Sequence, residues 1–169
     1  MDSDSKIFVA GHNGLVGSAV VRNLKEKGFK NIITVDRNRC DLKNENAVKT
    51  FFMIEQPEYV FLCAAKVGGI EMNINHPAEF IHANLMIQLN VIDAAYRHGV
   101  KKLVFLGSSC IYPKMAKQPI TEDELLSGKL ESTTESYAIS KIAGIKLCES
   151  YRKQYGCNFI SIQPSNVYG

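Results

Sequence analysis

Residues 6–17, Lys6-Ile7-Phe8-Val9-Ala10-Gly11-His12-Asn13-Gly14-Leu15-Val16-Gly17, join a short apolar run to a loop with three glycines. The apolar run predicts a buried strand, and residues 18–27 have helical periodicity until Gly28 stops it. Gly11 allows the tight turn, Gly14 lets backbone N–H groups approach a pyrophosphate, and Gly17 lets the helix pack close to the strand. Three glycines are weak evidence alone, but in this context they predict a nucleotide-binding strand, loop and helix.

The rest of the chain repeats this alternation of strands and helices. Further strands are expected at residues 31–36, 59–63, 102–106 and 159–163, and helices at residues 45–56, 77–98 and 136–155. The segment 111–134 holds two prolines and several polar residues and is expected to be a loop. Apolar strands separated by helices indicate a parallel sheet covered on both faces. We therefore predict an α/β fold with a Rossmann-like, doubly wound parallel sheet of five strands.

Composition argues against several classes of protein. The 169 residues carry a net charge of +3 with both signs interspersed, so nucleic acid is not expected as a partner. No apolar stretch approaches the roughly 20 residues of a membrane span, and residues 1–5 lack the features of a signal peptide. We expect a cytoplasmic protein without a membrane partner. The five cysteines lack the close spacing of a zinc site, so reduced thiols and no metal are expected.

Tyr137 and Lys141 stand four residues apart in the expected helix 136–155, which places both side chains on one face. A cation there favours the phenolate and lowers the pKa of a tyrosine from its usual value near about 10. Alone, a tyrosine and a lysine at this spacing are most often exposed side chains without a catalytic role. Here the strand 102–106 ends at Gly107-Ser108-Ser109-Cys110, so a hydroxyl is expected to meet the phenol at the carboxyl edge of the sheet. A nucleotide cofactor beside them predicts carbonyl reduction, with hydride from the cofactor and a proton from the phenol.

The residues after the second strand leave the choice of cofactor open. Asp36 ends that strand nineteen residues after Gly17, where an acid binds ribose hydroxyls and favours NAD. Arg37 and Arg39 follow, where a guanidinium holds a 2′-phosphate and favours NADP. Cys110 has two interpretations: a thiol at a strand end is usually a small buried hydrophobe, but beside a cleft it moves protons.

Five motifs together resemble a known family. They are the Gly11-x-x-Gly14-x-x-Gly17 loop, Ala64-Ala65-Lys66-Val67-Gly68-Gly69-Ile70, Gly107-Ser108-Ser109-Cys110-Ile111-Tyr112-Pro113, Tyr137 with Lys141, and Pro164-Ser165-Asn166-Val167-Tyr168-Gly169. The chain resembles the GDP-L-fucose synthases, which are extended short-chain dehydrogenases/reductases, from Lys6 to Gly169. The first and fourth motifs are common to the superfamily, whereas the second and third are much more specific.

The resemblance implies a reaction and an assembly. Enzymes of this kind epimerise GDP-4-keto-6-deoxy-D-mannose at C3 and C5 and reduce its C4 keto group with NADPH. It implies that Tyr137 is the acid at C4, that Ser108 is its partner on the keto oxygen, and that Lys141 contacts the cofactor ribose. Cys110 matches the family's cysteine that acts as a base in epimerisation. A homodimer is implied as well, because helices 77–98 and 136–155 match those that pair in the superfamily.

The resemblance also implies how NADP(H) is held. The glycine loop would hold the pyrophosphate, Arg37 the 2′-phosphate, Asp41 and Leu42 the adenine end, and the last motif the nicotinamide side. Asn13 replaces an arginine that some members carry, which weakens the NADP assignment, and Arg37 with Arg39 partly restores it. The expected contacts are Gly11, His12, Asn13, Gly14, Leu15, Val16, Gly17, Arg37, Asp41, Leu42, Leu106, Gly107, Ser108, Ser109, Lys141, Pro164, Ser165, Asn166 and Val167.

The chain departs from the family at its end. Family members continue into a histidine paired with the cysteine, the later strands and a smaller domain that holds the GDP-sugar. We therefore expect residues 1–169 to be the NADP-binding domain of a longer protein, inactive alone, rather than a degenerate product. Two other hypotheses stay open: another NAD(P)-dependent nucleotide-sugar epimerase or reductase, and a non-catalytic dinucleotide-binding fragment.

Overall fold

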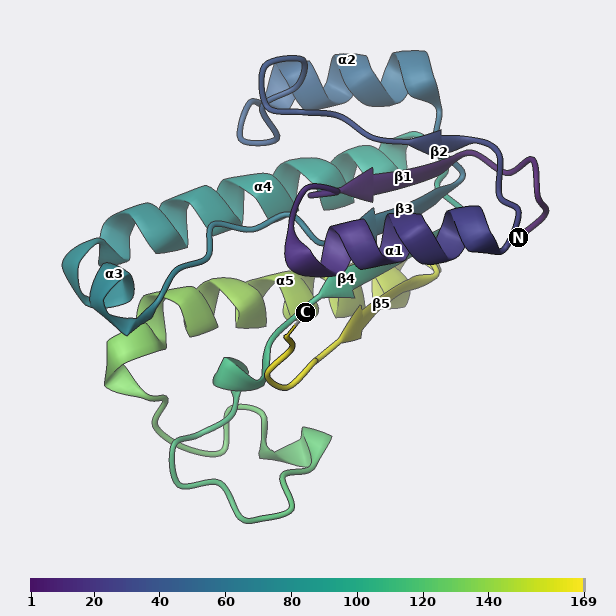
Figure 1. Ribbon diagram of the computed structural model, residues 1–169. Helices are drawn as coiled ribbons and strands as arrows, with labels where there is room; N and C mark the ends of the chain where they lie inside the picture. Colours follow the sequence, from purple (N-terminus) through teal and green to yellow (C-terminus); the bar gives the residue numbers. More distant parts are fainter. Residues whose placement is uncertain (169) are drawn as a thin grey trace.

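The computed structural model describes residues 1–168, and its centre is a sheet of five parallel strands (Figure 1). The strands are β1 (Ile7–Ala10), β2 (Ile32–Ile33), β3 (Tyr59–Leu62), β4 (Lys102–Leu106) and β5 (Phe159–Ile162). They lie in the order β2-β1-β3-β4-β5, and each neighbouring pair is parallel. This topology confirms the predicted Rossmann-like α/β sheet. Gly169, the last residue of the final motif, lies outside the described residues.

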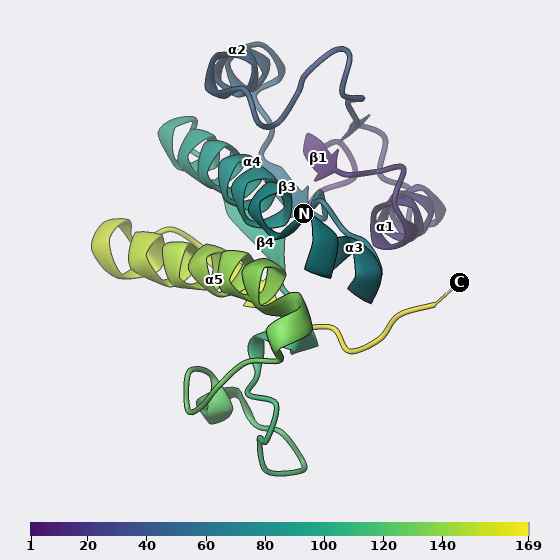
Figure 2. The ribbon, with the colours of Figure 1, turned by 90° about the vertical axis from the view of Figure 1, so that its left-hand side faces the viewer.

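Five α-helices connect and cover the strands. They are α1 (Leu15–Glu26), α2 (Glu45–Glu55), α3 (Ile70–Asn75), α4 (Pro77–Arg97) and α5 (Glu135–Tyr155). Figure 2 shows α1 on one side of the sheet and α2, α4 and α5 on the other. The ends of the long helices have local causes: the Asn44 side chain caps α2 by accepting from the Ala47 N–H, and Gly156 ends α5 with a left-handed φ of 70°.

Two segments differ from the sequence prediction. Helix α3 was not predicted, because its six residues are too few to show a helical period. The second strand was predicted over residues 31–36, but only Ile32 and Ile33 pair with β1. Asp36 instead begins a turn, in which its carbonyl accepts from the Cys40 N–H and its carboxylate accepts from the Arg39 N–H. The predicted loop 111–134 contains two short 3-10 helices, Glu122–Glu124 and Ser132–Thr134, and a third, Ser109–Ile111, begins just before it.

The two faces of the sheet are covered unequally. The larger core cluster lies on the side of α2, α4 and α5 and includes the fully buried Phe52, Phe105 and Phe159. On the opposite side α1 packs against β1 and β2. Ile162, at the end of β5, keeps 46% of its surface exposed. The sheet therefore has helices on both faces, as predicted, and its α1 side leaves the end of β5 exposed.

No helix within residues 1–168 combines the length and apolarity needed to cross a membrane. The longest two, α4 and α5, instead pack against each other, and α4 also contacts β3 while α5 contacts β4 and β5. Their contact is close because Gly144 of α5 faces Gln88 of α4 and Phe105 of β4. A Cβ atom at Gly144 would lie 2.4 Å from the Phe105 ring and 2.6 Å from the Gln88 side-chain oxygen.

We expect Gly144→Ala to destabilise the protein. Overpacking of this kind costs about 1–3 kcal/mol, which exceeds the roughly 0.8–1 kcal/mol that alanine gains over glycine in a helix. Urea unfolding should therefore give a lower free energy of unfolding for the variant. Ser150→Ala, on the exposed face of the same helix, is the control and should change it by no more than about 0.5 kcal/mol. An unchanged or higher stability of Gly144→Ala would contradict this packing.

Candidate functional site

A cleft of about 1030 Å³ lies at the carboxyl edge of the sheet. Open α/β sheets bind their ligands at this edge. The predicted site residues that line it are Gly11, His12, Asn13, Gly14, Leu15, Val16, Gly17, Arg37, Asp41, Leu42, Leu106, Gly107, Ser108, Tyr137, Pro164, Ser165 and Val167. Four predicted residues, Ser109, Cys110, Lys141 and Asn166, are not among the lining residues. In the described part of the chain, no group of three or more His, Cys, Asp and Glu side chains is placed to hold a metal ion.

The glycine loop is fixed by two positions that exclude a side chain. Gly11 has a φ of +84°, and a Cβ atom there would lie 2.7 Å from the backbone of Ala64. A Cβ atom at Gly17 would lie 2.1 Å from the carbonyl oxygen of Gly11. These contacts keep the start of α1 directly against the end of β1, as the sequence predicted.

The N-terminus of α1 is open toward the cleft. Gly14 is its N-cap and supplies no side-chain hydrogen bond to the first turn, whose residues Leu15, Val16 and Gly17 line the cleft. Unpaired backbone N–H groups and the helix dipole favour an anion at such a place. The residues present therefore fit the pyrophosphate of a dinucleotide.

Tyr137 and Ser108 meet at the wall of the cleft. Tyr137 lies in the first turn of α5, Ser108 follows β4, both line the cleft, and the Ser108 side chain is near enough to the phenol to lower its pKa. The Ser108 hydroxyl also accepts from the Cys110 N–H at 3.3 Å, which fixes it at the start of a 3-10 turn. Two hydroxyl groups are thereby held side by side where they can donate to one carbonyl oxygen.

Lys141 lies beneath this pair, one helical turn along α5 from Tyr137. Only 2% of Lys141 is exposed, and its Nζ donates to the carbonyl oxygen of Leu106 at 2.7 Å. The same Nζ lies 4.9 Å from the centre of the Phe105 ring and 5.8 Å from that of Tyr137. Burial lowers the pKa of Lys141 to about 8, and the nearby Cys63 opposes this shift.

The predicted lowering of the Tyr137 pKa is wrong for this structure. Burial raises the pKa of Tyr137, the hydrogen bond with Ser108 lowers it, and the charge of a Cys110 thiolate would raise it further. Lys141 does not reverse this balance, because its ammonium is directed at the Leu106 carbonyl and lies against the ring rather than at the hydroxyl. Desolvation of the phenolate is therefore the larger effect.

Three predicted residues lie beside the cleft rather than in its wall. The Ser109 N–H donates to the carbonyl oxygen of Pro164 at 3.2 Å and so ties the segment after β4 to the segment after β5. Cys110 is half-buried in the 3-10 turn next to Ser108 and Tyr137. Asn166 is exposed in the last described segment.

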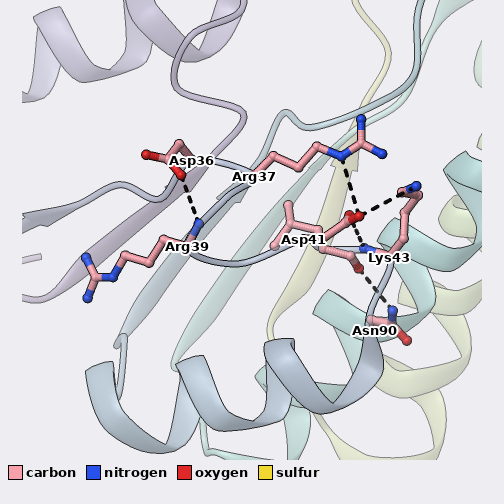
Figure 3. Close-up of polar contacts among 7 residues, drawn as sticks. Asp36, Arg37, Arg39, Asp41, Lys43 and Asn90 are labelled. Carbon is pink, nitrogen blue, oxygen red and sulfur yellow. Dashed lines mark hydrogen bonds and ion pairs between the residues drawn. The ribbon is translucent and has the colours of Figure 1, made fainter.

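The charged residues after β2 form a second part of the site (Figure 3). Arg37 and Asp41 line the cleft, and the Arg37 Nε lies 3.4 Å from the Asp41 carboxylate. Arg39 extends in the opposite direction and pairs with Glu55 at 2.5 Å. The expectation that Arg39 supports the site together with Arg37 is therefore wrong. Lys43 lies 3.6 Å from the Asp41 carboxylate instead.

The predicted site residues do not include several residues that line the cleft, and the longest run of these lies in the segment after β3. Cys63, Ala64, Ala65, Lys66 and Val67 form this wall. Asn84 of α4 holds it in place with both ends of its amide: it accepts from the Lys66 N–H at 2.7 Å and donates to the Lys66 carbonyl at 3.0 Å. The only sequence signal for this wall was the run Ala64–Ile70, which carries no charge pattern that specifies a contact.

Comparison with known proteins assigns the fold and the cleft to a family. Residues 7–169 match the NAD dependent epimerase/dehydratase family. The chain belongs to this family. Among its members, GDP-L-fucose synthase 1 of Arabidopsis thaliana is 59% identical over 168 residues, which are 99% of this chain and 52% of that protein.

Two solved members of the family superpose on the whole chain. The Campylobacter jejuni GDP-mannoheptose C4 reductase MlghC, solved with NADP bound, is 48% identical with a TM-score of 0.97, and the match covers 54% of it. A GDP-L-fucose synthetase from Naegleria fowleri bound to NADP is 30% identical with a TM-score of 0.89, and 56% of it is covered. The chain thus spans about half the length of the family members that it matches.

We expect the free energy of unfolding of the protein to depend on pH through the titration of Lys141. The unfolded chain keeps the Lys141 proton up to pH about 10.5, whereas the folded protein releases it near pH 8. The cost of burying the charge is therefore fully present below pH 8 and absent above about pH 10.5. Relative to Lys141→Met, the free energy of unfolding of the unmodified protein should rise by about 1.4 kcal/mol per pH unit within that window.

Urea unfolding of both proteins at several pH values from 7 to 10.5 measures this difference, and other titrating groups cancel in it. Lys146→Met, at an exposed position of the same helix, is the control and should show no such slope against the unmodified protein. A pH-independent difference for Lys141→Met would contradict the lowered pKa.

Proposed function

We propose that this protein uses NADP(H) to reduce the C4 keto group of a GDP-sugar. The observation that carries the proposal is that the Tyr137 and Ser108 hydroxyls line one cleft whose other end has an open helix N-terminus. A carbonyl reduction needs a proton donor and an anion-binding loop for the cofactor in one cavity, and this cleft contains both. The names of the relatives reported above support a GDP-sugar as the substrate.

We propose that residues 1–169 form the cofactor-binding domain. The glycine loop would bind the pyrophosphate through the N–H groups of Leu15, Val16 and Gly17, and the segment after β2 would bind the adenosine end. Lys141 would contact the nicotinamide ribose. When bound, the cofactor supplies the hydride.

The hydroxyl pair determines where the proton goes. Tyr137 protonates the C4 oxygen, and Ser108 donates a hydrogen bond to the same oxygen and keeps it beside the phenol. Tyr137 is mainly neutral at pH 7 because burial raises its pKa, so it enters the reaction with its proton. Lys141 then stabilises the phenolate by its charge until a proton from solvent restores the phenol.

We further propose that the substrate is GDP-4-keto-6-deoxy-D-mannose and that it is epimerised at C3 and C5 before reduction, which gives GDP-L-fucose. The C4 carbonyl acidifies both protons, and the Ser108 and Tyr137 hydroxyls stabilise the enolate oxygen that forms when either proton leaves. Cys110, next to this pair, is the base. A donor of the proton on the opposite face of the sugar would come from outside the described residues.

A second function of the same class has its own support. MlghC, which is a GDP-mannoheptose C4 reductase by name, superposes with a TM-score of 0.97 over the whole chain. Reduction of a different 4-keto GDP-sugar would use Tyr137, Ser108 and Lys141 in the same way. The two functions differ in whether Cys110 removes the C3 and C5 protons of the sugar. Exchange of these protons with solvent indicates epimerisation, and its absence indicates reduction alone.

We also propose a cytoplasmic homodimer. The five cysteines are free thiols, as expected in a reducing compartment. Leu89 of α4 and Ile139 of α5 keep 45% and 42% of their surfaces exposed, which supports a partner on this pair of helices.

The protein should bind NADPH more tightly than NADH. A charge-assisted hydrogen bond to the 2′-phosphate contributes about 1.5–3 kcal/mol, so Arg37→Ala should lose that amount of NADPH binding and little NADH binding. Calorimetric titration with both cofactors measures the change. Equal affinities of the unmodified protein for NADPH and NADH would refute the preference.

The two half-reactions should respond to different substitutions. Because this chain spans about half of its relatives, the assay uses a chimera in which residues 1–169 precede the remaining part of the Arabidopsis GDP-L-fucose synthase 1. Tyr137→Phe should slow NADPH oxidation by about 10²–10⁴-fold, as expected for loss of a general acid. It should slow the uptake of solvent deuterium at C3 and C5 much less, because Ser108 still donates a hydrogen bond to the enolate oxygen. Cys110→Ala should abolish the deuterium uptake and still reduce a ketone that is already epimerised. Loss of both activities in both variants would argue against separate roles.

A further inference from the structure

Two cations converge on one oxygen atom at the adenosine end of the cleft. The Arg37 Nε lies 3.4 Å and the Lys43 Nζ lies 3.6 Å from Oδ2 of Asp41. All three residues line the cleft, and Figure 3 shows the two basic side chains reaching the same carboxylate from different sides. Sequence reasoning singled out Arg37 but not Lys43, because Lys43 follows the turn rather than the strand.

The position of Lys43 is fixed by its backbone. Asp41 Oδ1 accepts from the Lys43 N–H at 3.0 Å, and the Asp41 carbonyl accepts from the Asn44 N–H at 2.8 Å. The Leu42 carbonyl accepts from the Asn90 side chain of α4 at 3.0 Å. The turn that carries Lys43 is therefore anchored to a helix of the larger core.

The other charged groups nearby are turned to different partners. The Asp36 carboxylate accepts from the Arg39 N–H at 2.9 Å, and the Arg39 guanidinium pairs with Glu55. Asp36 lines the cleft while one of its carboxylate oxygens accepts from this turn, and Arg39 does not line the cleft. Of the basic residues between β2 and α2, Arg37 and Lys43 are those that line it.

The charges of the cleft residues between β2 and α2 determine whether one cation is enough to attract a phosphate there. Asp36, Arg37 and Asp41, which all line this part of the cleft, sum to −1, so they offer no excess positive charge to an anion. Lys43 brings the sum of the four groups to zero. A phosphate monoester carries about −1.5 to −2 charges and competes with the single negative charge of Asp41 for both cations.

We propose that Lys43 is a second specificity-determining residue for the cofactor and binds its 2′-phosphate together with Arg37. This inference rests on the proposed use of NADP(H). Asp41 holds the two basic side chains in position by its ion pairs with them. When the cofactor binds, its phosphate replaces Asp41 as their partner. Lys43 thereby supplies the positive charge that the glycine loop, with Asn13 at its centre, does not contribute.

The test compares cofactors that differ only in the 2′-phosphate. Calorimetric titration of the protein with NADPH and NADH should show that Lys43→Met weakens NADPH binding by at least about tenfold and changes NADH binding by less than about twofold. Lys43→Arg should restore most of the NADPH affinity. Titration with 2′,5′-ADP and 5′-AMP should give the same pattern, because the effect resides at the adenosine end.

Lys49→Met is the matched control, since Lys49 is an α2 lysine that pairs with Glu45 and does not line the cleft. Its affinities for NADPH and NADH should equal those of the unmodified protein. The urea midpoint of Lys43→Met, measured in parallel, should stay close to that of the unmodified protein because the Lys43 side chain is one-third exposed.

Three results would overturn the inference. Equal losses of NADPH and NADH affinity in Lys43→Met would show a general effect on the turn, and no loss of either would show that Lys43 does not contact the phosphate. If Arg37→Ala still lowers the NADPH preference in those cases, the proposed function stands and only the role of Lys43 fails. Equal affinity of the unmodified protein for NADPH and NADH would overturn both.

Discussion

The approach of Gly17 to the carbonyl of Gly11 is the contact on which the rest of the site depends. It leaves no room for a side chain between the end of β1 and the start of α1, so the helix must begin at the edge of the sheet. The open N–H groups of its first turn then lie in the cleft. An anion placed there faces the ends of β3 and β4, which carry the other half of the site.

The hydroxyl end of the cleft depends on a different constraint, the burial of Lys141. An ammonium group with 2% exposure needs a hydrogen-bond acceptor, and the Leu106 carbonyl at the end of β4 provides it. This bond fixes α5 relative to β4, and therefore fixes Tyr137 relative to Ser108. The same burial lowers the pKa of Lys141 and raises that of Tyr137. One desolvated pocket thus moves the two pKa values apart, with that of Lys141 going down to about 8 and that of Tyr137 going up, because burial disfavours the charged form of each group.

The sequence predicted the elements that have a strong local pattern. The strand at residues 102–106 has the predicted bounds, and α5 begins one residue before the prediction, because an apolar run and a terminal glycine define them. Helix α3 and the early end of β2 could not be predicted, since they depend on a short helix and on a turn made by the side chain of Asp36. The positions of Arg39 outside the cleft and of Lys43 in its wall could not be predicted for a similar reason. Their directions follow from the partners Glu55 and Asp41, which no periodicity reveals.

The double hydrogen bond between Asn84 and the backbone of Lys66 has a mechanical consequence. One buried side chain satisfies both backbone polar groups of Lys66 in the cleft wall, so the wall is tied to α4 by two hydrogen bonds. Because α5 packs along α4, these bonds link the wall to both long helices. A displacement of α4 relative to the sheet would therefore also move this wall of the cleft.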